Sequence, residues 1–318
     1  MDTPREIGRR ILVPLDGSAL AELALPQAAA LASPEARVTL LRVVVPPSAG
    51  EDGDPELSLV SARQQLEDAA GRLYALAPEL NVDVAVLIGR PGAEIARFAE
   101  QRACDLILMA SFGEGGIHQW TFGSVAGQVV RSARVPVLIV RPQDAAEVGP
   151  RRFGRLLVPL DGSTRAEQSL PIARALVRRL RVPVHLVSVI DPDRAGFPDS
   201  GGTGPYSAVW QEIRDALHAE AQEALTHAAR SLTPLGVTAT WEVREGPTVA
   251  GIRAVTRPGD LIVLTSHARS NPPQWPQGSV GEQLVRTADV PIVLYRFAQP
   301  SDIVVPLSAE SEPARQES

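Results

Sequence analysis

The chain has 318 residues, about twice the length of a common single domain, and its 44% hydrophobic and 21% charged residues exclude disordered and collagen-like proteins. A net charge of −6 without a cluster of basic residues argues against nucleic acid as the main partner. The longest apolar runs, from Leu106 and from Leu261, are far shorter than the roughly 20 residues of a membrane-spanning helix, so we expect no membrane partner.

Short apolar runs alternate with helical patterns along the chain. The runs are rich in Val, Ile and Leu and are bounded by Gly, Pro or charge, which in the first half predicts strands at 11–15, 38–45, 82–88, 106–109 and 137–140. A three- and four-residue spacing predicts one helix through Leu59, Ala62, Leu66, Ala69, Leu73 and Leu76. The same spacing predicts another through Trp210, Ile213, Leu217, Ala221 and Ala224.

The second half of the chain repeats the first. The segment RRILVPLDGSALAELALPQA from Arg9 matches GRLLVPLDGSTRAEQSLPIA from Gly154, and the later landmarks keep their order. We therefore predict two homologous domains at 1–145 and 146–300, followed by a C-terminal tail at 301–318. Near-continuous apolar strands separated by helices indicate a parallel sheet covered on both faces. The fold class is α/β, with two tandem doubly wound (Rossmann-like) domains, each with a five-stranded parallel sheet and about four helices, related by a pseudo-two-fold axis.

Ligands of doubly wound domains bind beyond the carboxyl ends of the strands, and two motifs fall there. The first is Asp16-Gly17-Ser18, repeated at Asp161 to Ser163. Its structural interpretation is a tight turn and a serine helix cap. Its functional interpretation is a carboxylate that accepts hydrogen bonds from a ribose or a base.

The second motif is the long turn after the fourth strand, from Met109 to Ser124. Its glycines permit backbone N–H groups to approach an anion, and Gly123-Ser124 opens a helix whose positive N-terminus suits phosphate. This motif predicts a phosphate site without lysine, although turns also favour glycine.

With these motifs the two copies resemble tandem universal stress protein domains. The nucleotide signature of that family is glycine, two residues, glycine, nine residues, then glycine and serine or threonine. The first copy has Ala110, Gly113 and Gly123-Ser124 at these places, and the second has Thr265, Ala268 and Gly278-Ser279. The strand-one aspartate and the V-P-V-L ending complete the resemblance.

The resemblance implies an ATP pocket, with or without Mg²⁺, at the ends of strands one and two and on the glycine loop. The residues that it implies in the first domain are Pro14, Asp16, Val43, Met109, Ala110, Gly113, Gly123, Ser124 and Val125. Those in the second domain are Asp161, Val189, Leu264, Thr265, Ala268, Gly278, Ser279 and Val280.

The loops favour the first domain as the nucleotide site. In the second, Pro272, Pro273 and Pro276 each remove a backbone N–H, unless charge on Arg269 or His267 compensates. In the first, Glu114 faces the expected polyphosphate, and a bound Mg²⁺ would offset the repulsion.

No catalytic constellation emerges from the sequence. All 31 basic residues are arginine, which excludes Walker A and Schiff-base lysines. Cys104 borders an apolar run and is expected to be a small buried thiol. His218 and His227 stand nine residues apart, which does not suit a metal pair on one helix face. Trp120 and Trp275 occupy equivalent places and favour a hydrophobic plug or lid contact over base stacking.

The expected function is a stress-response protein that binds ATP or a related adenine nucleotide as a regulatory module. The start of the chain lacks the apolar region of a secretory signal, so we expect a cytoplasmic protein. The last strand of each copy is expected to pair with that of the other, as these strands pair across dimers of the family. A homodimer formed through other surfaces is a further alternative. The alternatives are a nucleotide-free dimeric scaffold and a slow ATP hydrolase.

Overall fold

The computed structural model describes residues 6–46, 55–110, 123–141, 153–164, 166–193, 207–266 and 279–296. The elements of the first half are β1 (Arg10–Pro14), η1 (Ala21–Leu23), α1 (Ala24–Leu31), β2 (Arg37–Val44), α2 (Pro55–Leu76), β3 (Asn81–Ile88), α3 (Pro91–Gln101), β4 (Leu106–Ala110), α4 (Ser124–Ser132) and β5 (Val137–Val140). Those of the second half are β6 (Arg155–Pro159), η3 (Ala166–Gln168), α5 (Ser169–Leu180), β7 (Val184–Ile190), α6 (Ser207–Leu232), η4 (Thr233–Leu235), β8 (Ala239–Glu245), α7 (Thr248–Val255), β9 (Asp260–Ser266), α8 (Val280–Thr287) and β10 (Ile292–Arg296).

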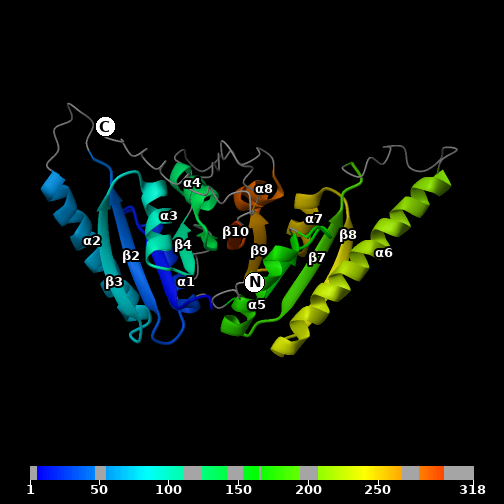
Figure 1. The fold of residues 1–318 in the computed structure, drawn as a ribbon, viewed down its shortest axis with the longest axis horizontal. Helices are drawn as coiled ribbons and strands as arrows, with labels where there is room; N and C mark the ends of the chain where they lie inside the picture. Colours follow the sequence, from blue (N-terminus) through cyan, green and yellow to red (C-terminus); the bar gives the residue numbers. More distant parts are fainter. Residues whose placement is uncertain are drawn as a thin grey trace, which may run out of the picture.

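The strands within the described residues form one ten-stranded sheet (Figure 1). Its order is β3-β2-β1-β4-β5-β10-β9-β6-β7-β8, so the two halves meet at their last strands. Within each half every pair is parallel, as in β1 with β2 and β6 with β7. Only β5 and β10 run antiparallel, with Ile139 opposite Ile292. The doubly wound prediction for each half is thereby confirmed.

Helices cover both faces of this sheet. On one face, α1, α2, α5 and α6 bury a core that includes Ile11, Leu66 and Leu225. On the other face, α3, α4, α7 and α8 bury a second core that includes Ile107 and Leu284. Each core contains residues from both halves, so the hydrophobic interior is continuous across the β5–β10 junction. Burial on both faces explains why the strands are apolar along their whole length.

The predicted strands lie within one residue of the observed ones, and the second predicted helix is present as α6. In α6, Ile213 is 39% exposed, whereas the fully buried side chains lie further along the helix, at Leu225, Ala228 and Leu232. Figure 1 shows the N-terminal end of α6 standing away from the sheet, which agrees with this difference in burial. In α2 the predicted residues Ala62, Leu66, Ala69 and Leu73 are buried.

Candidate functional site

The predicted site residues lie at the carboxyl ends of the parallel strands, beside the turns that follow β1 and β4. In the first half the structure describes Pro14, Asp16, Val43, Met109, Ala110, Gly123, Ser124 and Val125. In the second half it describes Asp161, Val189, Leu264, Thr265, Ser279 and Val280. The other predicted positions of the two loops lie outside the described residues: Gly113, Glu114, Trp120, His267, Ala268, Arg269, Pro272, Pro273, Trp275, Pro276 and Gly278.

Asp16 organises the turn after β1. Its Oδ1 accepts hydrogen bonds from the Ser18 N–H at 2.9 Å and the Ser18 hydroxyl at 2.6 Å. The Ser18 Oγ in turn accepts the N–H of Ala21, where η1 begins, at 3.1 Å. The same three bonds recur in the second half at Asp161, Ser163 and Ala166. The tight turn is confirmed, but Ser18 closes the turn and does not cap the helix, since the N-cap of η1 is Leu20. Oδ2 of Asp16 takes no hydrogen bond from the described part of the chain.

A cation that the sequence analysis did not select lies beneath this turn. Gly17 has a φ of +83°, and a Cβ there would come within 3.0 Å of Nη1 of Arg42 and 2.6 Å of Oε1 of Gln65. Nη1 of Arg42 is buried and has no hydrogen-bond partner among the residues that the structure describes. Burial lowers the pKa of Arg42, and the charge of Asp16 acts in the opposite direction. By strand register the equivalent residue in the second half is Ser188, so only the first site has this cation.

Apolar side chains form a wall next to the turn. Met109 is buried in the core under α3 and α4, and Val43 and Val125 pack partly buried against the same core. Pro14 is buried at the end of β1, and Ala110 ends β4 opposite Val140 of β5. The fold therefore brings together an apolar surface suited to a planar ring and a carboxylate oxygen that can accept hydrogen bonds.

The two helices that follow the glycine loops begin differently. In α8 the Ser279 Oγ accepts the N–H of Glu282 at 3.2 Å, and Glu282 adds a carboxylate in the first turn. In α4 the residue before the helix is Gly123, no side chain of the described residues caps the first turn, and no acidic residue lies in it. The hydroxyl of Ser124 is exposed and makes no hydrogen bond within the described residues. Because the first N–H groups of a helix are unsatisfied and positive, α4 is the better anion site of the two.

Comparisons with known proteins show the family of this chain. The sequence profile of the universal stress protein family matches residues 8–141 and again residues 152–296. The chain belongs to the universal stress protein family. A universal stress protein of Mycobacterium tuberculosis (strain H37Rv) is 29% identical over 283 residues, which cover 84% of this chain and 92% of the relative. Another from Methanocaldococcus jannaschii is 32% identical over 139 residues, covering 42% of this chain and 82% of the relative.

A solved structure supports the fold of this family member over both halves. The crystal structure of a universal stress protein from Archaeoglobus fulgidus DSM 4304 matches with a TM-score of 0.62 at 18% identity. The match covers 91% of this chain and 98% of that chain, so the tandem arrangement is shared as a whole.

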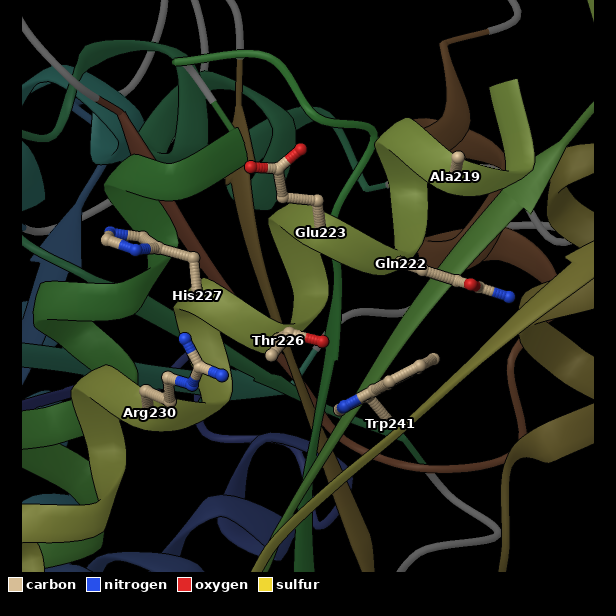
Figure 2. A pocket seen from close by; sticks show the side chains of 7 residues that line it. All are labelled: Ala219, Gln222, Glu223, Thr226, His227, Arg230 and Trp241. Atoms are coloured by element: carbon tan, nitrogen blue, oxygen red, sulfur yellow. The ribbon is translucent and has the colours of Figure 1, made fainter. Parts of the chain in front are cut away.

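A pocket of about 450 Å³ lies elsewhere, between α6 and β8 at the outer edge of the sheet. None of the predicted site residues lines it. Figure 2 shows Trp241 and Gln222 on one side of the helix and Glu223, His227 and Arg230 on the other. Because these polar groups point in different directions, they do not form a common binding point.

Three further features of the described residues concern a thiol, metal binding and membrane crossing. Cys104 is buried, as predicted, and burial raises its pKa to about 11, so its thiol stays protonated at neutral pH. Among the residues that the structure describes, no group of three His, Cys, Asp or Glu side chains is placed to hold a metal ion. No helix in the described ranges has the length and apolar character needed to cross a membrane.

Proposed function

We propose that the first domain binds ATP or a related adenine nucleotide, with or without Mg²⁺, and that the protein acts as a regulatory binding module. The contrast between the two helix N-termini carries the proposal. As far as the structure describes the chain, the first turn of α4 has no side-chain cap and no acidic residue, whereas that of α8 is capped by Ser279 and carries Glu282. Phosphate oxygens are favourable ligands for N–H groups at such a helix start.

The residues of the first domain fit the nucleotide. Oδ2 of Asp16 would accept a hydroxyl of the ribose, and the backbone of Val43 would face the base. Pro14, Met109 and Ala110 supply apolar surface, and Gly123, Ser124 and Val125, with Gly113 of the loop, would hold the phosphates. Arg42 adds a positive charge beside Asp16, and within the described ranges its buried Nη1 lacks a hydrogen-bond partner. When bound, the nucleotide supplies a polyanion, and this charge suits the first site better than the second.

The second domain supplies a set of residues that is less suited to binding a nucleotide. Asp161, Val189, Leu264 and Thr265, together with Ala268, Gly278, Ser279 and Val280, correspond to the first set by position. Ser188 replaces the cation of the first site, and Glu282 adds negative charge near the expected phosphates. We therefore propose one nucleotide per chain.

The proposal includes the organisation of the chain. We place the domains at 1–145 and 146–300 with a tail at 301–318, limits that enclose both profile matches. The β5–β10 pairing occupies the last strand of each half, so any homodimer would form through other surfaces. The proposal assumes a cytoplasmic protein, with cellular ATP as its ligand.

Isothermal titration calorimetry with ATP and Mg²⁺ tests this function on the full chain and on two matched variants. Asp16→Ala and Asp161→Ala remove the same turn bonds in the two halves, so they control for each other's structural effect. We expect one saturable site, weakened roughly tenfold or more by Asp16→Ala and unchanged by Asp161→Ala, since a hydrogen bond to a charged group contributes about 1.5–3 kcal/mol.

The two alternatives have distinct outcomes in the same experiment. Release of phosphate during the titration would indicate a hydrolase instead. The absence of binding heat at several temperatures would indicate a nucleotide-free scaffold. Equal weakening by both aspartate variants would contradict the assignment to the first domain.

A further inference from the structure

The C-terminal ends of α4 and α8 are each held by an arginine from the other half of the chain. Arg296, the last residue of β10, donates from Nη1 to the carbonyl oxygen of Arg131 in the last turn of α4, at 2.8 Å. Arg141, directly after β5, donates from Nη2 to the carbonyl of Leu284 at 3.2 Å and from Nη1 to that of Ala288. The contact is therefore reciprocal.

The strand pairing at the centre of the sheet produces this exchange. Because β5 and β10 are antiparallel, the end of each strand lies beside the start of the other. That position is also where the helix preceding the other strand ends, since α4 leads into β5 and α8 leads into β10. Arg141 and Arg296 occupy equivalent places in the two repeats, so one geometric arrangement accounts for both contacts.

Each arginine adds donors to carbonyl groups at a helix end; that of Leu284 also accepts the N–H of Ala288, at 2.7 Å. The last carbonyl groups of a helix have no intrahelical donor and form the negative end of its dipole. A guanidinium placed there donates hydrogen bonds and also opposes the dipole with a full positive charge. Arg141 is only 4% exposed, which shows how closely these groups pack into the junction.

The opposite end of α4 is the proposed phosphate site. The helix has nine residues, so at about 1.5 Å per residue it is a short rod whose two ends move together. α4 packs on α3 and on β10, and Arg296 fixes it along its axis. A contact at one end of this helix can therefore influence how the N–H groups of Ser124 and Val125 are aligned at the other.

We propose that Arg296 is a positioning residue for the nucleotide site of the first domain, so that the second domain completes a site that it does not itself contain. The inference rests on the proposed function. Arg296 touches no nucleotide and acts through α4. Its mirror residue, Arg141, holds α8, whose first turn is occupied by Ser279 and Glu282, and so has no influence on nucleotide binding.

The test compares Arg296→Gln with Arg141→Gln in the full chain, because both remove the same guanidinium at the same junction. Calorimetry with ATP and with adenosine separates the phosphate-dependent part of binding from the rest. We expect Arg296→Gln to weaken ATP roughly fivefold or more, within the usual range of coupling between sites. Adenosine affinity stays unchanged, Arg141→Gln leaves both affinities unchanged, and Arg296→Lys, which keeps the charge and a donor, restores part of the ATP affinity.

Amide hydrogen exchange on the nucleotide-free protein supplies a second readout. Arg296→Gln should speed exchange of the hydrogen-bonded amides of α4 (residues 127–132), and Arg141→Gln should not. Equal effects of the two variants on ATP affinity, or equal loss of ATP and adenosine affinity in Arg296→Gln, would overturn the inference while leaving the proposed function intact. Failure of the unaltered chain to bind ATP would overturn the proposed function and the inference together.

Discussion

Asp105 and Asp260 occupy equivalent places in the two repeats, at the amino edge of the sheet, yet each is satisfied differently. Asp105 is 7% exposed and accepts the backbone N–H groups of Gly8 at 2.8 Å, Arg9 at 2.9 Å and Arg10 at 2.8 Å. Asp260 instead pairs with the Arg155 side chain at 2.9 and 2.6 Å and accepts the Arg257 N–H. A buried carboxylate needs such partners, and these two fasten the start of β1 and of β6.

Asp105 should make stability depend on pH. Burial raises the pKa of Asp105, and the three backbone hydrogen bonds only partly oppose this effect. A raised folded-state pKa means that Asp105 favours the folded state most below about pH 4, and that this contribution is lost as pH rises through the folded pKa. Asp105→Asn leaves buried N–H groups facing an amide NH₂, so we expect it to lower the free energy of unfolding by about 2 kcal/mol at pH 7.

Urea unfolding of both proteins between pH 4 and pH 7 measures this effect. The difference in free energy of unfolding between the unaltered chain and Asp105→Asn should narrow as pH rises. Asp83→Asn is the control, because Asp83 is 57% exposed beside Arg37 and should change stability by less than about 0.5 kcal/mol. A difference in free energy of unfolding that stays constant with pH would contradict the raised pKa of Asp105.

At the scale of the helices, both repeats contain the same helices, but equivalent helices begin differently. α4 and α8 follow equivalent strands and pack on the same face of the sheet. Only α8 uses its serine as a cap, with Glu282 in the first turn. A helix that caps itself is more stable without ligand, while one that leaves its first N–H groups unsatisfied is better prepared for an anion. The start of α8 in the second half therefore favours stability without ligand, and the start of α4 in the first half favours anion binding.

A pair of serine substitutions tests this difference. Ser279→Ala removes a cap and should lower the free energy of unfolding by about 1 kcal/mol. Ser124→Ala removes an exposed hydroxyl without a partner in the described residues, so stability should change by less than about 0.5 kcal/mol. Under the proposed function, Ser124→Ala weakens ATP binding and Ser279→Ala does not. Denaturant titration and calorimetry measure the two effects, and similar effects of both variants would argue against the difference.

At the scale of the whole molecule, the junction makes the two repeats one folding unit. The residues of β5 are buried, and both hydrophobic cores pass across the β5–β10 pair. Arg179 of α5 adds hydrogen bonds to the carbonyl groups of Leu31, at 2.9 Å, and of Ala32 at the end of α1. Burial lowers the pKa of Arg179. A single half would expose the β5 edge and the open sides of both cores.

Residues 1–145 produced alone should therefore form a dimer. An exposed apolar edge strand pairs readily with another chain, and a second copy can take the antiparallel place of β10. Light scattering coupled to size exclusion should give twice the mass of the fragment. The full chain is the control, because β10 already occupies this edge. A folded, monomeric fragment would show that the junction is not needed to cover β5.

Much of the architecture follows from the sequence because the relevant signals are local. Strands buried on both faces appear as short apolar runs, and the repeat of Asp16-Gly17-Ser18 predicts the same turn twice. The turn bonds of Asp16 and Ser18 join residues only two or three positions apart, so their pattern is visible in the chain itself. The charged Arg42 inside an apolar strand is the sequence signal for this part of the site, and it belongs to neither of the two motifs.

The tertiary structure alone decided which residues of distant segments come into contact. Arg42 lies beneath Gly17 because β1 and β2 pair in a particular register. Arg296 reaches α4 because two strands 155 positions apart in equivalent repeats, β5 and β10, run antiparallel at the centre of the sheet. Ser279 caps its helix and Ser124 does not, because α8 begins after Ser279 whereas α4 begins at Ser124. Local spacing determines elements and turns, whereas register and packing across the sheet determine which side chains meet, and those depend on the whole folded chain.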